Sequence, residues 1–172
     1  MFLKKDNLTI LNAVAADAQQ LAAWWNDGSV MAHAGFPNGL GISPEEIAAS
    51  LSKDTDELHR RHIIEENGVP IGEMNYRNKG GGVAEIGIKI CVSACQHRGL
   101  GKQLLRMFIG GLFDDLGYDD IILDTNLNNL RAQHVYESLV FEMVRVNIDS
   151  WTDQLGNKQS SVDYRMKNPH IS

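Results

Sequence analysis

The spacing of apolar and polar residues predicts strands and helices in mixed succession along the chain. Residues 61–66 and 69–76 alternate on either side of Asn67-Gly68, a dipeptide typical of tight β-hairpins. Residues 83–91 also alternate, and they follow three consecutive glycines that indicate a turn. Residues 100–116 instead place apolar side chains at the spacing of one helix face. The other predicted elements are strands at 9–14, 120–125, 141–149 and 161–167, and helices at 15–26, from Ser43 to about Leu51, and at 129–139.

Cap and turn residues support the ends of several of these elements. Ser43-Pro44-Glu45-Glu46 places an N-cap serine before a proline and puts a glutamate three residues after the cap. Gly117 ends the helix at 100–116, and the glycine-rich residues 28–42 are predicted to form a loop. The resulting order β-α-α-β-β-β-α-β-α-β-β indicates one α/β (α+β) domain built on a mixed sheet.

Length and composition are those of an ordinary globular domain. The 172 residues suffice for one buried core, with 43% hydrophobic and 22% charged residues. No segment approaches the roughly 18 consecutive apolar residues of a membrane-spanning helix. The start, Met1-Phe2-Leu3-Lys4-Lys5-Asp6, lacks the apolar run that follows the charges of a signal peptide. We therefore expect a cytoplasmic protein that does not bind membranes.

Charge, cysteines and histidines narrow the classes of partner. The net charge of −6 disfavours nucleic acid and is compatible with a cationic substrate. Cys91 and Cys95 are so close in sequence that a disulfide would close a very short loop, and we expect them to be reduced and packed. The six histidines show no spacing typical of a metal site, so no metal is predicted.

A glycine-containing turn joins the strand at 83–91 to the helix at 100–116. Its residues are Gln96-His97-Arg98-Gly99-Leu100-Gly101-Lys102. The first N–H groups of a helix have no partner within it, and the helix dipole adds about half a positive charge there. Glycine lets the backbone approach an anion closely, and Arg98 and Lys102 add positive charge. The segment therefore predicts a phosphate-binding site.

Two familiar phosphate-binding patterns do not fit this turn. A P-loop requires glycine where Gln96 stands and a hydroxyl side chain where Gln103 stands. A dinucleotide-binding turn requires a third glycine where Leu104 stands. A nucleotide-phosphate enzyme is therefore disfavoured as a function.

A second motif lies one helix and one strand further along the chain. Asn129 is followed by Ala132, Tyr136 and Phe141 at fixed spacing. Together with Gln96-x-x-Gly99-x-Gly101, this pattern resembles the GCN5-related N-acetyltransferase (GNAT) family, except that Val140 replaces the family's glycine. Because a β-branched residue disfavours positive φ, we expect the turn at Val140 to differ from that of the family.

The resemblance implies a fold, a cosubstrate and a reaction. The fold is a single domain over residues 1–172, a mixed and mostly antiparallel sheet of six to seven strands flanked by about four helices. The CoA-binding core spans about residues 83–146. The cosubstrate is acetyl-CoA, and the reaction is transfer of its acetyl group to a primary amine by direct attack in a ternary complex. A non-catalytic acyl-CoA-binding regulatory module remains the alternative.

The same resemblance assigns roles to individual residues. Tyr136 is the candidate general acid, and Glu85 or Asp124 is the candidate base. A backbone N–H near Cys91 would polarise the thioester carbonyl. The strand end would pair with the pantetheine arm, Asn129 would hydrogen-bond to that arm, and the turn would bind the pyrophosphate. The implied cofactor-binding residues are Lys89, Ile90, Cys91, Gln96, His97, Arg98, Gly99, Leu100, Gly101, Lys102 and Asn129.

The acceptor site is the least defined part of the resemblance. The family builds it from the first helices, their connecting loop and the last hairpin, here Trp24, Trp25, Asp27 and Tyr76, with Trp151 as a further candidate. Trp24-Trp25-Asn26-Asp27 is similar to the branch of ribosomal-protein N-terminal and spermidine acetyltransferases. Alternatively, one tryptophan packs in the core and the other is partly exposed. Acidic residues would suit a cationic amine: Asp27, Glu45, Glu73, Glu85 and Asp124.

Several properties of the acceptor and the assembly are left open by the sequence. The acceptor is a small-molecule amine or a protein N-terminal amine, and its class is not specified. The final strands resemble those that mediate dimers in the family, so a homodimer is a possible assembly.

Overall fold

One sheet contains all of the strands in the computed structural model, which describes residues 1–171. The strands are β1 (Phe2–Lys5), β2 (Leu8–Asn12), β3 (His59–Glu66), β4 (Val69–Gly80), β5 (Val83–Ile90), β6 (Asp120–Asn126), β7 (Glu142–Thr152) and β8 (Lys158–Lys167). Their order is β1-β2-β3-β4-β5-β6-β8-β7. Neighbours are antiparallel except β5 and β6, which are parallel. The mixed, mostly antiparallel sheet expected from the sequence is therefore confirmed.

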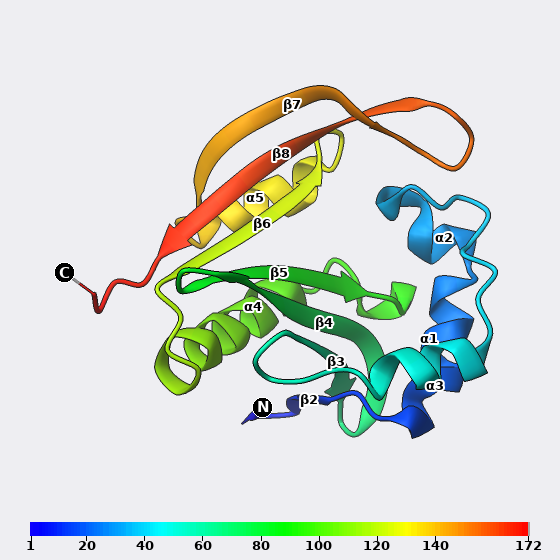
Figure 1. Ribbon diagram of the computed structural model, residues 1–172, viewed down its shortest axis with the longest axis horizontal. Coiled ribbons are helices and arrows are strands. Elements are labelled where there is room, and N and C mark those ends of the chain that lie inside the picture. The colour runs from blue at the N-terminus through cyan, green and yellow to red at the C-terminus, as the bar shows by residue number, and fades with distance from the viewer. Residues whose placement is uncertain (172) are drawn as a thin grey trace.

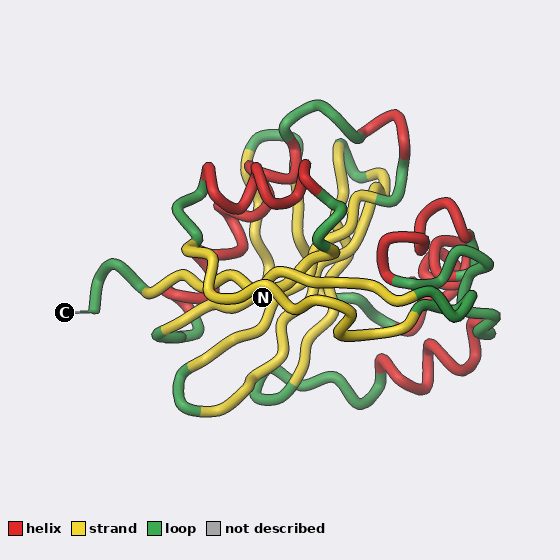
Figure 2. The backbone as a smooth tube through the Cα atoms, turned by 90° about the horizontal axis from the view of Figure 1, so that it is seen from above, coloured by secondary structure: helices red, strands yellow, loops and turns green. Residues whose placement is uncertain are grey.

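Helices cover both sides of this sheet (Figures 1 and 2). They are α1 (Ala18–Trp25), α2 (Gly28–Met31), α3 (Pro44–Leu51), α4 (Leu100–Gly110) and α5 (Leu130–Ser138). The expected capping box begins α3, where Ser43 Oγ accepts from the Glu46 N–H and Glu46 Oε2 accepts from the Ser43 N–H. No helix among residues 1–171 is long and apolar enough to cross a membrane.

Two buried clusters pack on opposite faces of the sheet. The larger joins α4 and α5 to the strands, with Leu104, Phe108 and Leu123 among its buried members. The smaller lies under α1 and α3 and includes Leu21 and Ile47. Alternating side chains of one strand reach both clusters, because successive residues point to opposite faces. The polar side chains of β4 and β5 therefore lie on the same side of the sheet as α1, opposite the side that α4 covers.

The N-terminal part differs from the sequence prediction. A hairpin of β1 and β2 replaces the single strand expected at 9–14, so the sheet has eight strands rather than six to seven. β1 has four residues and lies at the sheet edge, where its side chains are mostly exposed. A strand without a buried face has no alternation to detect.

Helix boundaries also differ from the prediction. The predicted helix at 15–26 begins with a 3₁₀ turn at Ala15–Asp17, and α1 follows it. The predicted loop at 28–42 contains α2 and a second 3₁₀ turn at Ala32–Ala34. The predicted helix at 100–116 is α4 followed by a π-helical turn at Gly111–Asp115. Five α-helices therefore stand where about four were expected.

The parallel pair leaves a gap in the middle of the sheet. β5 and β6 pair only at Val83–Asp120, Ala84–Ile121 and Glu85–Ile122. Beyond Glu85 the two strands diverge, with β4 and β5 on one side and β6, β8 and β7 on the other (Figure 1). The facing edge of β5 from Ile86 onward is therefore open to another extended chain.

Candidate active site

The turn before α4 has the geometry of an anion site. Gly99 is the N-cap of α4 and adopts φ 75°, a left-handed conformation that favours glycine. Leu100, Gly101 and Lys102 form the first turn of α4, whose N–H groups have no partner within the helix. Gln96 Nε2 donates to the Ile90 carbonyl at 2.9 Å and so holds the turn against the end of β5. The local part of the phosphate-site prediction is consistent with this geometry.

The cationic residues of the turn have protein partners. Arg98 forms a bidentate ion pair with Glu66 at 2.9 and 3.0 Å, so its charge is already compensated. His97 adopts φ 60°, and its Nε2 lies 3.2 Å from Nη1 of Arg131 on α5. Sequence reasoning did not single out Arg131, although a cation in the first turn after Asn129 was a visible signal. Arg98 holds the turn to the β3–β4 hairpin, and Arg131 supplies cationic charge beside it.

The open edge of β5 offers N–H groups to a bound chain. The N–H groups of Cys91 and Val92 both donate to the Ile71 carbonyl, at 2.8 and 3.2 Å. The Ile90 carbonyl instead points away from β4, toward Gln96. Backbone groups alternate in direction along an antiparallel strand, so the Ile88 and Ile90 N–H groups face the gap. Of the N–H groups near Cys91, that of Ile90 is therefore the one available.

Both cysteines are buried and free, as expected from the sequence. Burial raises the pKa of the Cys91 thiol to about 12, so Cys91 is a packed side chain and not a thiolate at neutral pH. Cys91 therefore contributes to the site through its backbone and not through its thiol.

Tyr136 extends from α5 toward the gap. Its ring packs edge-on against Phe141 and Tyr164, with ring centroids 6.0 and 5.6 Å away. Only 8% of the residue is exposed, and within residues 1–171 its hydroxyl makes no hydrogen bond. Burial, followed by the charge of Asp124 and then Tyr164, raises the pKa of Tyr136 to about 12. The phenol is therefore protonated at neutral pH.

Three carboxylates lie on one face of the strands that border the gap. Glu85 pairs with Ile122 in register, and Asp124 follows two residues later on the same face of β6. Asp163 lies directly opposite Asp124 on β8. Asp124 is exposed, and desolvation by the surrounding protein, followed by the charges of Glu85 and then Asp163, raises its pKa. Lys79 lies 3.8 Å from Glu85. Sequence reasoning did not single out Asp163, because only the pairing of β6 with β8 brings it opposite Asp124.

The turn between β6 and α5 is organised by Asn129. Its side chain caps α5 by accepting a hydrogen bond from the Ala132 N–H at 3.2 Å. At the other end of α5, Val140 adopts φ 68° and is 81% exposed. The expectation of a different turn at Val140 is therefore wrong. The chain keeps the left-handed conformation, and the valine bears the strain that glycine avoids.

The two adjacent tryptophans have different roles. Trp24 is buried in the cluster under α1 and α3, which removes it from the acceptor site. Trp25 Nε1 donates to both carboxylate oxygens of Glu73, at 2.9 and 3.0 Å. Burial raises the pKa of Glu73, an effect that Lys89, 3.9 Å away, opposes. Asp27 caps α2 by accepting hydrogen bonds from Ser29.

Tyr76 does not lie where the sequence reasoning placed it. It has no exposed surface and packs against His62, Phe108 and Tyr118 on the α4 face of the sheet. Its hydroxyl donates to the Asp56 carbonyl at 3.0 Å. The reason is strand parity: Tyr76 alternates with Asn75 and Arg77, which occupy the opposite face of β4. Tyr76 is a core residue.

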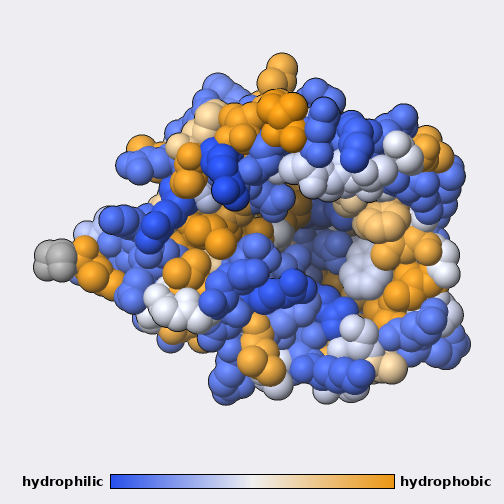
Figure 3. Space-filling model, turned by 45° about the horizontal axis from the view of Figure 1, so that its top comes forward, coloured by the Kyte–Doolittle hydropathy of each residue, from blue (hydrophilic) through white to orange (hydrophobic). Residues whose placement is uncertain are grey.

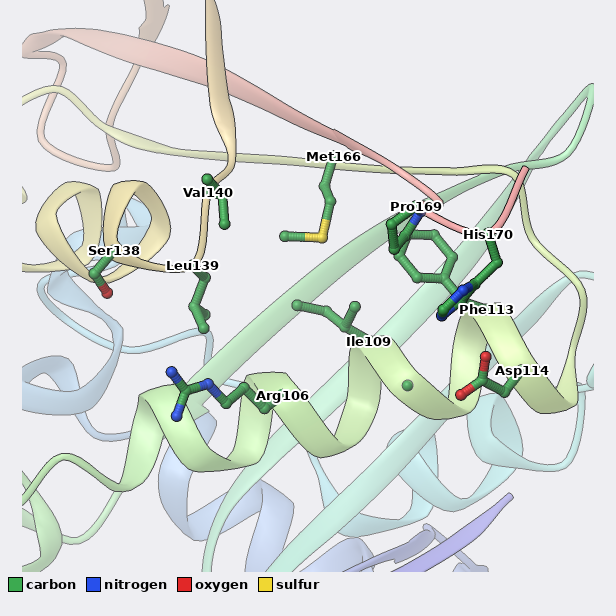
Figure 4. Close-up of a pocket in the computed structure, with 11 residues that line it drawn as sticks. Arg106, Ile109, Phe113, Asp114, Ser138, Leu139, Val140, Met166, Pro169 and His170 are labelled. Atoms are coloured by element: carbon green, nitrogen blue, oxygen red, sulfur yellow. The ribbon is translucent and has the colours of Figure 1, made fainter. Parts of the chain in front are cut away.

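Surface pockets elsewhere do not belong to this site. One of about 330 Å³ lies between α4, the end of α5 and the C-terminal segment, lined by Arg106, Ile109, Phe113, Met166, Pro169 and His170 among others (Figure 4). Another lies beside the turn at residues 80–82.

The space-filling view shows the surface hollowed near its centre, with hydrophilic residues around much of the rim (Figure 3). Among residues 1–171, no group of three metal-ligating side chains is placed to hold an ion.

Comparison with known proteins gives the family. Residues 7–142 match the sequence model of the family described as Acetyltransferase (GNAT) domain. No curated protein matches the chain.

Solved structures share the fold at low sequence identity. A spermidine N-acetyltransferase from Vibrio cholerae in complex with CoA and spermine is 21% identical, with a TM-score of 0.84 over 95% of this chain and 96% of that one. A ribosomal L7/L12 alpha-N-protein acetyltransferase in complex with coenzyme A is 12% identical, with a TM-score of 0.83 over 97% and 98%. The family match covers most of the chain and accounts for both of its motifs, so the chain belongs to the GNAT family and is an acetyl-CoA-dependent N-acetyltransferase.

Proposed function

We propose that this enzyme acetylates the primary amine of a small cationic molecule, with Tyr136 as general acid and Asp124 as general base. The observation that carries the proposal is the Tyr136 hydroxyl, which makes no hydrogen bond within residues 1–171 although its ring is packed against Phe141 and Tyr164. The charge of Asp124, on β6, contributes to the raised pKa of Tyr136, on α5, so a proton donor and a proton acceptor lie on the same side of the gap. Acid and base groups with separated pKa values are the arrangement that proton transfer requires.

The donor is bound by backbone groups in this proposal. The turn from Gln96 to Lys102 and the first N–H groups of α4 bind the pyrophosphate of acetyl-CoA. The pantetheine arm lies along the open edge of β5 between Lys89 and Cys91, with Asn129 on the other side. The Ile90 N–H faces the gap and stabilises the oxyanion of the tetrahedral intermediate, an effect worth about 3 to 4 kcal/mol for one preorganised donor.

The chemical step balances without a metal or a redox partner. Asp124 takes one proton from the acceptor ammonium, and the neutral amine nitrogen attacks the thioester carbonyl carbon. A C–N bond forms, the C–S bond breaks, and the departing thiolate takes the proton of the Tyr136 hydroxyl. The second amine proton returns to Tyr136 through water. Asp124 then releases its proton to solvent, so the products are the N-acetyl amine, CoA with a free thiol, and one proton.

Asp124 suits the role of base better than Glu85. Its pKa is raised by desolvation and by two neighbouring carboxylates, which brings it closer to the operating pH. Glu85 has Lys79 as an ion-pair partner at 3.8 Å, whereas no cation within residues 1–171 forms an ion pair with Asp124. In this proposal Glu85 and Asp163 attract the acceptor ammonium, and Asp124 takes its proton.

The carboxylates favour a polyamine-like acceptor. Glu85, Asp124 and Asp163 lie on one face at the gap, where summed negative charge concentrates cations. The spermidine N-acetyltransferase of similar fold binds spermine and CoA, which supports the same acceptor class here. A protein N-terminus carries one positive charge and bulk beside it, so it fits the three carboxylates less well.

The test is turnover of a Tyr136→Phe variant, measured as thiol release from acetyl-CoA with spermidine as acceptor. Phenylalanine keeps the contacts to Phe141 and Tyr164 and removes only the hydroxyl. We expect kcat to fall by on the order of 10²-fold or more, with an unchanged KM for acetyl-CoA. Tyr118→Phe, another buried tyrosine, is the matched control and should keep wild-type turnover.

Two companion measurements complete the test. Asp124→Asn should abolish the acidic limb of the pH profile of kcat/KM, because this limb reports the base losing its proton as the pH rises. Glu85→Gln should instead mainly raise the KM for the amine. Unchanged turnover in Tyr136→Phe would contradict the catalytic role. A wild-type protein that binds acetyl-CoA but acetylates no amine would instead support the regulatory-module alternative.

A further inference from the structure

A groove on the α4 side of the sheet lies apart from the candidate active site. It has a volume of about 330 Å³ and lies between α4, the end of α5 and the segment after β8 (Figure 4). A cavity of roughly this volume or more is typical of sites for small molecules. No residue assigned to acetyl-CoA or to the acceptor lines it. We name this cavity the α4 groove.

The segment after β8 is held in place where it closes the α4 groove. The side chain of buried Asn168 donates to the Tyr118 carbonyl at 3.2 Å, and its backbone N–H donates to the Asp119 carbonyl at 2.8 Å. Asn168 Oδ1 also accepts from the His170 N–H at 3.0 Å. Pro169 and His170 therefore form a fixed wall of the groove.

Gly110 keeps the middle of the α4 groove open. It has φ −56°, an ordinary helical conformation, and a Cβ there would meet open space. Neither backbone conformation nor packing therefore requires a glycine, although glycine within a helix is less stable than alanine. The neighbouring Gly111 differs, because a Cβ there would overlap the Met1 side chain. A side chain at Gly110 would instead occupy the groove.

Val140 borders the same groove in an unfavourable conformation. Its φ of 68° is disfavoured for a β-branched residue, and 81% of the residue is exposed, so burial does not explain the valine. Figure 4 shows it on the side of the groove opposite Pro169. Gly110 and Val140 are thus two positions at which local stability is lost beside one cavity.

A π-helical turn supplies the floor at the far end of the α4 groove. Such turns are rare and are frequent at functional sites. The turn Gly111–Asp115 continues α4 and carries Phe113 and Asp114 to the groove. Ile109 precedes Phe113 by four residues, so both lie on one face of the helix. Met166 of β8 points toward Ile109 from the opposite wall (Figure 4). The centre of the groove is therefore apolar.

Arg106 places an uncompensated positive charge at the near end of the α4 groove. Its guanidinium makes no ion pair or hydrogen bond within residues 1–171, and α4 contains no acidic residue. A guanidinium can bind a carboxylate through two parallel hydrogen bonds. Asp114 lies eight residues further along, which is roughly 12 Å at the rise of a helix. The groove thus offers a cation, an apolar centre and then an anion.

We propose that the α4 groove is a binding site for an apolar monocarboxylate of the medium-chain fatty acid type. Its carboxylate pairs with Arg106, and its chain lies along Ile109, Gly110 and Phe113. A second carboxylate at the far end of the chain would meet Asp114 and be repelled. The site shares no residue with the acetyl-transfer machinery, so this inference stands independently of the proposed function.

The experiment measures binding of octanoate to the full chain by isothermal titration calorimetry. We expect octanoate to bind the wild type, with at least tenfold lower affinity for Gly110→Leu, which fills the groove, and for Arg106→Gln, which removes the charge. Octylamine and octanedioate should bind the wild type at least tenfold more weakly than octanoate. The matched control is Lys53→Gln, which removes an exposed positive charge after α3 and should keep wild-type affinity.

The variants at Gly110 and Val140 remain informative because neither disturbs a packed contact. Gly110→Leu should resist urea at least as well as the wild type, since leucine is the better helix former. Val140→Gly removes an apolar wall and should bind octanoate several-fold more weakly while remaining folded. A wild type that does not bind octanoate at millimolar concentration would overturn the proposal. Equal binding of octylamine, or wild-type affinity in folded Gly110→Leu, would overturn it as well.

Discussion

At the scale of single residues, the charge of Asp124 affects the ionisation of Tyr136. Burial and the negative charge of Asp124 keep the Tyr136 phenol protonated, while desolvation and nearby carboxylates hold the pKa of Asp124 above its usual value. The shift of Asp124 brings the base closer to neutral pH, whereas that of Tyr136 keeps the phenol in the protonated form that a proton donor requires. Neither shift can be derived from residue identity, because each depends on a neighbour from another element.

Val140 is the residue at which substitution should stabilise the protein. Its φ of 68° costs a β-branched residue about 1 kcal/mol or more, and its side chain is exposed. Val140→Gly removes this strain, partly offset by the greater freedom of glycine in the unfolded chain. We expect a net gain of about 0.5 to 1 kcal/mol, measured by urea unfolding. Val144→Gly, at an exposed position of negative φ, should destabilise instead. A less stable Val140→Gly variant would contradict strain at this turn.

At the scale of elements, His62 lies where helix α4 packs on the sheet. It has no exposed surface and lies 5.2 Å from the Phe108 ring of α4 and 5.8 Å from Tyr76, measured between ring centroids. Neither of its ring nitrogens has a hydrogen-bond partner within the described part of the chain. Burial lowers the pKa of His62 to about 3. The packing of α4 therefore contains a neutral, unsatisfied imidazole.

His62→Leu should make the protein more resistant to acid. Between about pH 6.5 and pH 3 the unfolded chain binds a proton on this histidine that the folded state excludes. The free energy of unfolding therefore falls with decreasing pH, by up to about 1.4 kcal/mol per unit. The leucine variant loses this dependence and also removes unsatisfied polar atoms.

The measurement for His62 is urea unfolding of both proteins at several pH values from 4 to 7. The stability difference in favour of His62→Leu should widen steadily as the pH falls. His134→Leu, on the exposed side of α5, should follow the wild type. A constant difference across this range would show that His62 is protonated in the folded state.

Element type was largely predictable from the sequence, and element contacts were not. The Asn67-Gly68 hairpin is confirmed, with φ of 52° and 76°, because its conformation depends on two adjacent residues. The capping box of α3 could be predicted for the same reason, because Ser43 and Glu46 are only three residues apart. Tyr76 was assigned to the wrong face, since its face depends on which helix covers which side of the sheet, whereas for the tryptophans the alternative of one packed in the core and one partly exposed is confirmed. β1 was missed because an exposed edge strand has no buried alternation.

At the scale of the whole molecule, β7 forms one edge of the sheet and carries an apolar row. Val144, Val146 and Ile148 are 62%, 41% and 67% exposed. A long edge strand with exposed apolar side chains favours pairing with another strand. The homodimer expected from the sequence remains a prediction, and a symmetric contact through β7 is the arrangement consistent with this surface.

Light scattering after size exclusion measures this assembly directly. We expect the wild-type protein to run as a dimer and Val146→Lys to run as a monomer, because lysine at the centre of the row opposes close packing. Val69→Lys, at an exposed position of the β3–β4 hairpin, should leave the dimer intact. A monomeric wild type at micromolar concentration would contradict self-association through β7.

The sequence by itself determined the conformation of the turn before α4 and the motif that follows it. Glycine conformations and the free N–H groups of a helix start depend on consecutive residues, so Gln96 to Lys102 could be interpreted locally. Only the tertiary structure decided that Asp163 lies opposite Asp124 and that Glu66 neutralises Arg98. These contacts join segments far apart in the chain. They follow from the order of the strands in the sheet, which the hydrophobic pattern does not specify.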